Sequence, residues 1–149
     1  MKEITGDIWD YHDKGNWIVV TTNGTVKKDG TAVMGRGIAL QAKQKFPDLP
    51  KKLGELLKQH GNKVFIFGEE KIITLPTKND WANMAKNYLI EEGVKELATI
   101  REDSGNFVSG DVYMVRPGCG YGGLQWADVK SIIEKYLDDS FIIVENKSL

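Results

Sequence analysis

A strand, a glycine-rich loop and a helix can all be read from residues 112–133, VYMVRPGCGYGGLQWADVKSII. The run at 112–115 is apolar and rich in β-branched and aromatic residues, which predicts a buried strand. Apolar residues recur every three or four positions from Val129 to Leu137, which predicts a helix. Between the two, four glycines fall within residues 118–123. A strand, a tight loop and a helix in this order form the repeating unit of an α/β sheet.

The same alternation continues along the rest of the chain. Further buried strands are predicted at 17–20, 64–67, 72–75 and 141–144, with a weaker one around Glu3 to Trp9, and further helices from Ile38 to Phe46, from Leu53 to a stop at Gly61, and from Ala85 to Ile100 with Asn79 or Asp80 as the N-cap. No linker or internal repeat interrupts the pattern. We therefore expect one α/β domain over residues 1–149, a three-layer α/β/α fold in which a mixed central sheet is flanked by helices.

Composition and charge exclude several classes of protein. The formal net charge is only −1, so the chain lacks the long-range attraction to nucleic acid that a strongly basic domain has, and a polynucleotide would have to be held by a local site. A single cysteine, Cys119, excludes an internal disulfide, and with only two histidines no metal site is expected. Neither a signal peptide nor a membrane-spanning run is predicted, so we expect a cytoplasmic protein with no membrane partner.

Two glycine-rich loops are candidates for holding phosphate. Residues 34–38 open the helix that ends near Phe46, and residues 118–124 lead into the helix that begins near Gln125. Glycine lets backbone N–H groups approach an anion closely, and the helix N-terminus behind each loop adds partial positive charge. Tight turns and helix caps would explain the same glycines without a ligand. Two such loops in one domain favour a diphosphate over a single phosphate.

The second loop also imitates a different motif. Gly118, Gly120 and Gly123 satisfy the G-x-G-x-x-G fingerprint of dinucleotide-binding folds, and Glu145 could serve as the acid that binds ribose. That fingerprint normally lies in the first strand–helix–strand unit, whereas here it lies in the last. We therefore reject a dehydrogenase.

Four segments together resemble the macro domain, a module that binds ADP-ribose. They are Gly6-Asp7-Ile8, residues 19–23, residues 34–39 and residues 117–126. The resemblance implies that the Asp bonds the adenine amino group, that an Asn faces the distal ribose, and that the two loops hold the diphosphate. The ligand-binding residues implied in this way are Asp7, Ile8, Asn23, Met34, Gly35, Gly37, Ile38, Pro76, Thr77, Gly118, Cys119, Gly120, Tyr121, Gly122, Gly123 and Leu124.

Residues 75–78, Leu-Pro-Thr-Lys, followed closely by Trp81, are similar to one branch of that family, which holds terminal ADP-ribose glycohydrolases and DNA-ADP-ribosyl glycohydrolase antitoxins. The likeness implies that Lys78 is catalytic. It could act as an ammonium that orients the substrate or protonates a leaving group, or as an amine that attacks the opened sugar; a solvated lysine is the alternative. Relatives of the terminal glycohydrolase type have an Asp where this chain has Gly122, so an antitoxin-like site is expected. Residues Lys27 to Ala32 look like an insertion that could reshape the distal-ribose side.

The function implied is a hydrolase that removes ADP-ribose from a modified DNA base or protein. Two alternatives remain, which are hydrolysis of ADP-ribose-1″-phosphate and binding of ADP-ribose without turnover. Cys119 is interpreted as a small loop filler, since the sequence places no histidine beside it, and Arg36 as solvated. The expected partners are ADP-ribose or an ADP-ribosylated macromolecule and, functionally, an ADP-ribosyltransferase. No cofactor is expected, and the protein is expected to be monomeric.

Overall fold

The computed structural model describes residues 1–103 and 107–147. Within them, strands form one sheet in the order β1-β6-β5-β2-β4-β3. These strands are β1 (Lys2–Gly6), β2 (Trp17–Asn23), β3 (Phe65–Phe67), β4 (Ile72–Lys78), β5 (Val112–Val115) and β6 (Phe141–Asn146). Neighbours are parallel except β3 and β4, which are antiparallel. The prediction of a mixed α/β sheet is confirmed.

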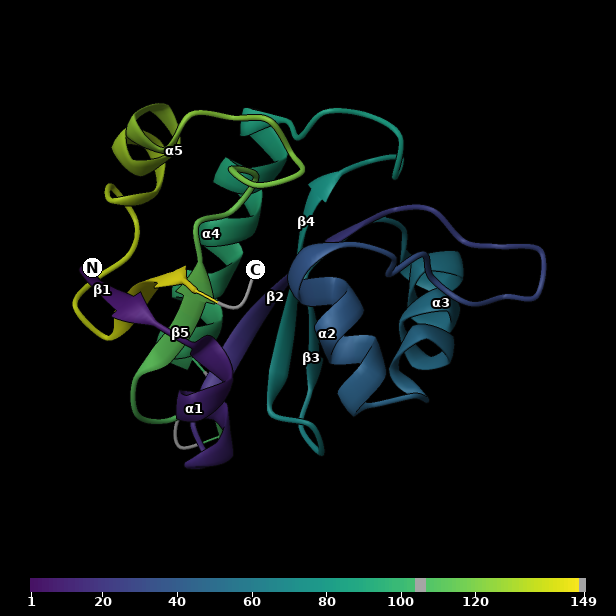
Figure 1. The fold of residues 1–149 in the computed structure, drawn as a ribbon, viewed down its shortest axis with the longest axis horizontal. Coiled ribbons are helices and arrows are strands. Elements are labelled where there is room, and N and C mark those ends of the chain that lie inside the picture. The colour runs from purple at the N-terminus through teal and green to yellow at the C-terminus, as the bar shows by residue number, and fades with distance from the viewer. Residues whose placement is uncertain (104–106, 148–149) are drawn as a thin grey trace.

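Helices cover both faces of this sheet (Figure 1). They are α1 (Ile8–Asp13), α2 (Gly37–Lys45), α3 (Leu49–His60), α4 (Asn87–Asp103) and α5 (Trp126–Ile133). Helices α1, α2 and α3 share one apolar cluster with Ile18 and Val20 of β2. Helices α4 and α5 share the other with Trp17 and Val19 of the same strand. Successive residues of a strand point to opposite faces, so a strand covered on both sides needs the continuous apolar run that the sequence carries.

The weak strand expected around Glu3 to Trp9 is only partly correct. Strand β1 ends at Gly6, and the chain then turns into α1, which the sequence did not predict. The Asp7 carboxylate caps this helix by accepting a hydrogen bond from the backbone N–H of Trp9 at 3.0 Å. A helix of one and a half turns is too short to show a clear apolar period.

The expectation that Asn79 or Asp80 caps α4 is wrong. The helix begins only at Asn87. Asp80 instead accepts a hydrogen bond from the backbone N–H of Ala82, within a local turn. Residues 79–86 therefore form a loop between β4 and α4, and this loop borders the site described below.

The C-terminal end of α3 was predicted correctly, and that of α5 was not. Helix α3 ends at His60 and is stopped by Gly61, as predicted; the φ of +84° at this C-cap favours glycine. Helix α5 ends at Ile133 rather than Leu137, although Leu137 is still buried in the core. None of the helices in the described part of the chain has the length and apolarity that a bilayer span requires.

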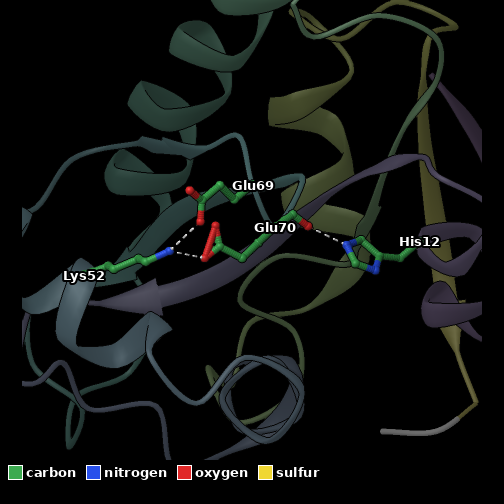
Figure 2. A network of polar contacts seen from close by, with 4 residues as sticks. All are labelled: His12, Lys52, Glu69 and Glu70. Carbon is green, nitrogen blue, oxygen red and sulfur yellow. Dashed lines mark hydrogen bonds and ion pairs between the residues drawn. The ribbon is translucent and has the colours of Figure 1, made fainter.

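A polar network holds the end of the sheet where β4 begins (Figure 2). Lys52 of α3 forms ion pairs with Glu70 at 2.7 Å and with Glu69 at 3.3 Å. The Glu70 carbonyl oxygen lies 2.7 Å from Nε2 of His12 in α1. Because the Glu70 side chain is buried, its pairing with Lys52 offsets the cost of removing a carboxylate from water. The hydrogen bond from Lys52 to Glu70 also raises the pKa of Lys52.

The connections create a crevice at the opposite, carboxyl edge of the sheet. Strands β2 and β5 are hydrogen-bonded neighbours. The helix that follows β2 packs on one face of the sheet, and the helix that follows β5 packs on the other. The chain therefore leaves the two strand ends in diverging directions, and α/β sheets bind ligands at such a switch point.

Candidate functional site

A cavity of about 1030 Å³ opens at this switch point. It lies between residues 35–39, at the first glycine-rich loop and the start of α2, and residues 118–122, in the second glycine-rich loop. The carboxyl ends of β2, β4, β5 and β6 supply most of its remaining lining. A cavity of this size can hold a nucleotide-sized ligand.

The structure brings most of the predicted site residues together around this cavity. Those that line it are Asn23, Gly35, Gly37, Ile38, Thr77, Lys78, Gly118, Cys119, Gly120, Tyr121 and Gly122. They come from four separate stretches of sequence, so only the parallel arrangement of the strands makes them neighbours.

Four predicted residues of the same stretches do not line the cavity. Met34 is buried in the core beside α2 and α3. Pro76 lines a second, smaller pocket of about 410 Å³, because it precedes Thr77 on a strand whose successive side chains alternate. Leu124 lies beside Gly118 and partly in the core, and Gly123 forms the turn with a φ of +79°. Their chain neighbours Gly35, Thr77 and Gly122 line the cavity instead.

Asp7 and Ile8 also lie outside the cavity lining. Asp7 caps α1, as described above. The backbone N–H of Ile8 donates to the side-chain oxygen of Asn146, and Asn146 does line the cavity. Asn146, at the end of β6, therefore lies between the predicted adenine-binding segment and the cavity.

Asn23 lines the cavity, but both the nitrogen and the oxygen of its side-chain amide form hydrogen bonds to the backbone. Its nitrogen donates to the Val33 carbonyl oxygen at 3.1 Å, and its oxygen accepts from the Thr25 N–H at 3.0 Å. Asn23 thus fixes the start and the end of the segment that leads to the first glycine loop. This combines the Asx-turn role of such a residue with a position at the site.

The glycines of the two loops differ in the space around their Cα atoms, and so in the reason that glycine is needed there. A Cβ at Gly35 or Gly120 would meet no protein atom within 4 Å. Packing does not require glycine there, whereas close approach of a ligand to the backbone would. At Gly122 a Cβ would lie 2.4 Å from the Gly118 carbonyl oxygen and 2.8 Å from the Ala85 Cβ. Gly122 therefore has no room for any side chain, an Asp included.

Lys78 reaches the cavity at the end of β4. A register shift opposite Thr22 and Asn23 inserts one extra residue into β4 just before Lys78. Its Nζ is 3.4 Å from the Tyr121 carbonyl oxygen in the second loop, to which it donates. Burial lowers the pKa of Lys78, and the charge of Arg36 lowers it further. Perturbed lysines in a cleft are candidates for chemistry.

The backbone of Lys78 is held from the side away from the cavity. The Asn62 side chain donates to the Lys78 carbonyl oxygen at 2.9 Å and to the side-chain oxygen of Asn79 at 3.1 Å. Nothing in the local sequence marks Asn62, because it lies 16 residues before Lys78 in the loop after α3.

Cys119 lines the cavity without the properties of a nucleophile. Burial raises the pKa of its thiol, and Sγ lies 3.5 Å from the Pro117 carbonyl oxygen. A raised pKa keeps the thiol protonated, and thiols react as thiolates. This agrees with its interpretation as a loop filler.

Several lining residues escaped the sequence analysis as site residues. Arg116 and Asn146 lie at or directly after the ends of β5 and β6, and the rule that ligands bind at carboxyl ends could have found them. Arg116 forms an ion pair of 3.5 Å with Glu145, which also lines the cavity. Arg36 is exposed, as expected, but it borders the cavity and contacts aromatic rings.

The insertion forms a hairpin that packs mainly on α3. Val26 and Ala32 form an antiparallel bridge, and the Ala32 N–H donates to the Pro50 carbonyl oxygen at 2.8 Å. Within residues 27–32, only Lys27 lines the cavity. The hairpin thus contributes one cation to the cavity rim.

The fold and site define a class of protein, which is an α/β/α domain with a nucleotide-sized cavity between two glycine loops at a topological switch point. No family model matches the chain. Several curated proteins match it in sequence. The DNA ADP-ribosyl glycohydrolase of Thermus aquaticus is 28% identical over 135 residues, 84% of this chain and 37% of that protein. The one of Mycobacterium tuberculosis is 33% identical over 107 residues, 66% of this chain and 30% of that protein.

A third relative joins two activities in its name. The DNA ADP-ribosyl transferase-DNA ADP-ribosyl glycohydrolase fusion protein of Thermosipho africanus is 26% identical over 137 residues, which cover 76% of this chain and 34% of that protein. The chain therefore spans about a third of the length of the curated relatives it matches.

Solved structures share the fold of this chain. The macrodomain of Mycobacterium tuberculosis DarG superposes with a TM-score of 0.70 at 27% identity, over 87% of this chain and 88% of that one. The macrodomain of Thermus aquaticus DarG gives 0.77 at 24% identity, over 96% and 95%. Thermosipho africanus DarTG in complex with ADP-ribose gives 0.72 at 23% identity, over 87% and 37%. The chain therefore has the macro domain fold.

Proposed function

We propose that this macro domain binds ADP-ribose attached to a DNA base and releases it by hydrolysis, with Lys78 as the catalytic residue. The observation that carries the proposal is the half-buried amine of Lys78, which lies at the cavity with a lowered pKa and beside the second glycine loop. The names of the curated relatives support the DNA-linked substrate.

The binding half of the proposal concerns the diphosphate. The open backbone at Gly35 and Gly120 leaves space for phosphate oxygens on either side of the cavity. Gly37 begins α2, whose N-cap residue Arg36 makes no side-chain hydrogen bond to the helix, so the N–H groups of the first turn and their partial positive charge face this end of the helix. Asn146 of β6 and Lys78 of β4 line the cavity from opposite sides. The adenine would lie toward Asn146, because Asn146 is hydrogen-bonded to Ile8 of the predicted adenine-binding segment. The distal ribose would then lie toward Lys78.

The catalytic half concerns two possible roles of Lys78. As a neutral amine it would form a bond to C1″ of the distal ribose while the bond to the base breaks, and the leaving base would take the proton that the alkylated amine loses. Water would then add to C1″ and break its bond to the lysine nitrogen, which releases ADP-ribose and restores the amine. As an ammonium it would donate that proton directly to the leaving base while water attacks C1″. Burial and the charge of Arg36 lower the pKa of Lys78, so the neutral amine is more available here than in a free lysine. The crowding at Gly122 argues against any step that needs an Asp in that loop.

The proposal is tested with an ADP-ribosylated oligonucleotide and three proteins. We expect the wild type to release ADP-ribose and Lys78→Ala to release it at least ~100-fold more slowly, which is the usual minimum loss for a group that transfers a proton. Lys51→Ala is the matched control, because Lys51 is an exposed lysine on α3 outside the cavity. Calorimetry should show that both variants still bind free ADP-ribose.

Three results would change the conclusion. Equal release by wild type and Lys78→Ala would remove Lys78 from the mechanism. ADP-ribose binding by the wild type without release from any substrate would favour a binding module. Release of inorganic phosphate from ADP-ribose-1″-phosphate, with no action on the oligonucleotide, would favour the phosphatase.

A functional pairing with an ADP-ribosyltransferase is the second part of the proposal. It is supported by the Thermosipho africanus relative, whose name joins a transferase to a glycohydrolase. If it holds, co-expression with a DNA ADP-ribosyltransferase should leave less ADP-ribose on cellular DNA than co-expression of the transferase with the Lys78→Ala variant. Equal modification in the two cultures would contradict it.

A further inference from the structure

Large apolar side chains gather on the surface beside the cavity. Among the described residues, six large hydrophobic side chains are exposed. Four of these lie in the loop after β4, in the first turn of α4 or in the second glycine loop: Trp81, Met84, Tyr88 and Tyr121. Trp81 is 47% exposed and Tyr121 is 67% exposed. A cluster of this kind at one edge of a small domain indicates an interaction surface.

A cation joins the two rings that border the cavity. The Arg36 guanidinium lies 5.9 Å from the ring centroid of Trp81 and 5.3 Å from that of Tyr121. Both distances are within the range of a cation–π interaction. Trp81, Arg36 and Tyr121 belong to three different loops, so this row, which we call the aromatic rim, exists only in the folded protein.

Backbone contacts hold the aromatic rim in position. The Trp81 N–H donates to the Thr25 hydroxyl at 3.0 Å, and the Ala85 N–H donates to the Gly122 carbonyl oxygen at 3.0 Å. The loop of Trp81 is thereby tied both to the hairpin and to the loop of Tyr121. A surface that is already fixed loses little conformational entropy when a ligand stacks on it.

The aromatic rim adjoins the proposed catalytic amine. Lys78 donates to the carbonyl oxygen of Tyr121, and Trp81 follows Lys78 by three residues. A group attached to the distal ribose would therefore leave the cavity at the aromatic rim. This step rests on the proposed function.

The charge around the aromatic rim differs from that of the whole chain. Within residues 1–103 and 107–147, four cations line the cavity that the rim borders, Lys27, Arg36, Lys78 and Arg116, against one carboxylate, Glu145. The formal net charge of the chain is −1. The carboxylate of Glu145 is already paired with Arg116 at 3.5 Å. The local excess of positive charge suits a phosphodiester backbone.

We infer that the aromatic rim is a stacking platform for the bases that flank the modified nucleotide in single-stranded DNA. Trp81 and Tyr121 offer exposed rings to the bases, and Arg36 and Lys27 lie near enough to the cavity mouth to meet the phosphates. Stacking needs bases that are free of a complementary strand, so the platform selects single strands over duplex.

The test measures binding of unmodified DNA and of free ADP-ribose separately. The DNA probe is a labelled single strand of about ten nucleotides, within the usual site size of such surfaces, and the same sequence as a duplex. By fluorescence anisotropy at low salt we expect the wild type to prefer the single strand, and Trp81→Ala to weaken that binding by roughly tenfold, the effect of one lost base stack. Trp81→Phe, which keeps a ring, should restore most of the affinity.

The control is Phe107→Ala, because Phe107 is exposed to 59% but packs beside Trp17, away from the cavity. It should bind the strand as the wild type does. Unchanged binding by Trp81→Ala, equal binding of duplex and single strand, or an equal loss in Phe107→Ala would each overturn the platform. So would an equal slowing by Trp81→Ala of release from an ADP-ribosylated peptide and from an oligonucleotide.

The two proposals fail in different ways. If the wild type binds ADP-ribose in calorimetry but not the single strand, the platform is wrong and the proposed function is unaffected. If it binds the strand through Trp81 but not ADP-ribose, the proposed function is wrong while the aromatic surface still binds DNA. A thermal unfolding curve for each variant shows whether a loss of binding comes from loss of the fold.

Discussion

Lys78 is a lysine in surroundings that disfavour its charge. Burial and the nearby charge of Arg36 both lower its pKa from the ordinary value of 10.5. The neutral amine is therefore available at lower pH than in a free lysine. If the amine is the nucleophile, single-turnover release should rise with pH and level off before pH 10.5. Removing the charge in Arg36→Gln should move the midpoint of this rise to higher pH.

Arg101→Gln is the control for the pH profile, because Arg101 donates to the Gly110 carbonyl oxygen outside the cavity. Its midpoint should match the wild type. A rate that instead falls as pH rises through this range would mean that the ammonium acts as a general acid, and the lowered pKa would then limit activity.

The glycines at 120 and 122 give opposite predictions. Gly120→Val adds a side chain into open space, so the free energy of unfolding should change by no more than ~0.5 kcal/mol, as for a surface substitution. ADP-ribose affinity should fall at least ~10-fold, about 1.4 kcal/mol, if the ligand approaches this backbone. Gly122→Ala should instead lower the free energy of unfolding by roughly 1–3 kcal/mol, because its Cβ overlaps the Gly118 carbonyl.

Urea unfolding and calorimetry on the two variants measure these quantities. Unchanged ADP-ribose affinity in Gly120→Val would show that the second loop holds no phosphate at this position. A stable Gly122→Ala would show that the loop can open, and the exclusion of an Asp there would lose its physical basis.

At the scale of elements, α3 and the hairpin at 26–32 touch without side chains between them. A Cβ at Gly54 of α3 would lie 2.0 Å from the Gly30 carbonyl oxygen. In an open helix, Gly→Ala stabilises by about 1 kcal/mol. We expect Gly54→Ala to destabilise by roughly 1–3 kcal/mol instead, because the hairpin must move away.

The displaced hairpin should also change the rim of the cavity. Lys27 is the hairpin residue that lines it, so Gly54→Ala should weaken ADP-ribose binding more than Lys51→Ala, a change on the same helix outside the cavity. Chemical denaturation and calorimetry measure the two effects. A Gly54→Ala variant more stable than the wild type would mean that the hairpin does not pack on α3 as described.

At the scale of the whole molecule, the cavity joins elements from both faces of the sheet. Helices α2 and α5 follow the two neighbouring strands into different apolar clusters, and the cavity lies between the loops that lead to them. A ligand that bridges these loops binds the folded chain and not the unfolded one. ADP-ribose at ~100 times its Kd should then add about 2.7 kcal/mol to the free energy of unfolding.

For a domain of this size that gain corresponds to a rise in Tm of roughly 5–10 °C. Thermal unfolding at increasing ADP-ribose concentration measures it, and adenosine without phosphates at the same concentrations is the control. We expect a much smaller rise with adenosine. Equal rises would mean that the glycine loops contribute little to binding.

Much of this architecture could be predicted from the sequence alone. The apolar runs at 17–20, 72–75 and 141–144 are buried strands, and the order of strands and helices gave the mixed sheet with helices on both faces. The glycine loops and the position of Lys78 at a strand end were equally visible. These features are local, because periodicity and glycine content act over a few neighbouring residues.

Contacts between distant residues could not be predicted in the same way. Asp7 has the motif of an adenine-binding residue, but it caps α1 behind the cavity lining. Asn79 and Asp80 have side chains typical of N-caps, yet α4 starts only at Asn87. Just before the helix, the Lys86 N–H donates to the Thr77 carbonyl oxygen at 2.8 Å, a contact with β4 that the local sequence does not indicate. A side chain or N–H that has several possible partners is assigned to one of them only by the packing of other segments.

The sequence by itself therefore determined the strands of the sheet interior, most of the helices, the two glycine loops and the candidate lysine. The tertiary structure alone decided that Gly122 has no room for a side chain, that Asn62 holds the backbone of Lys78, and that Arg36 lies between two aromatic rings. The physical reason is the separation along the chain over which each effect acts. Propensity and periodicity are set within one turn or strand, whereas steric exclusion and hydrogen-bond partners depend on which distant segments the core brings together.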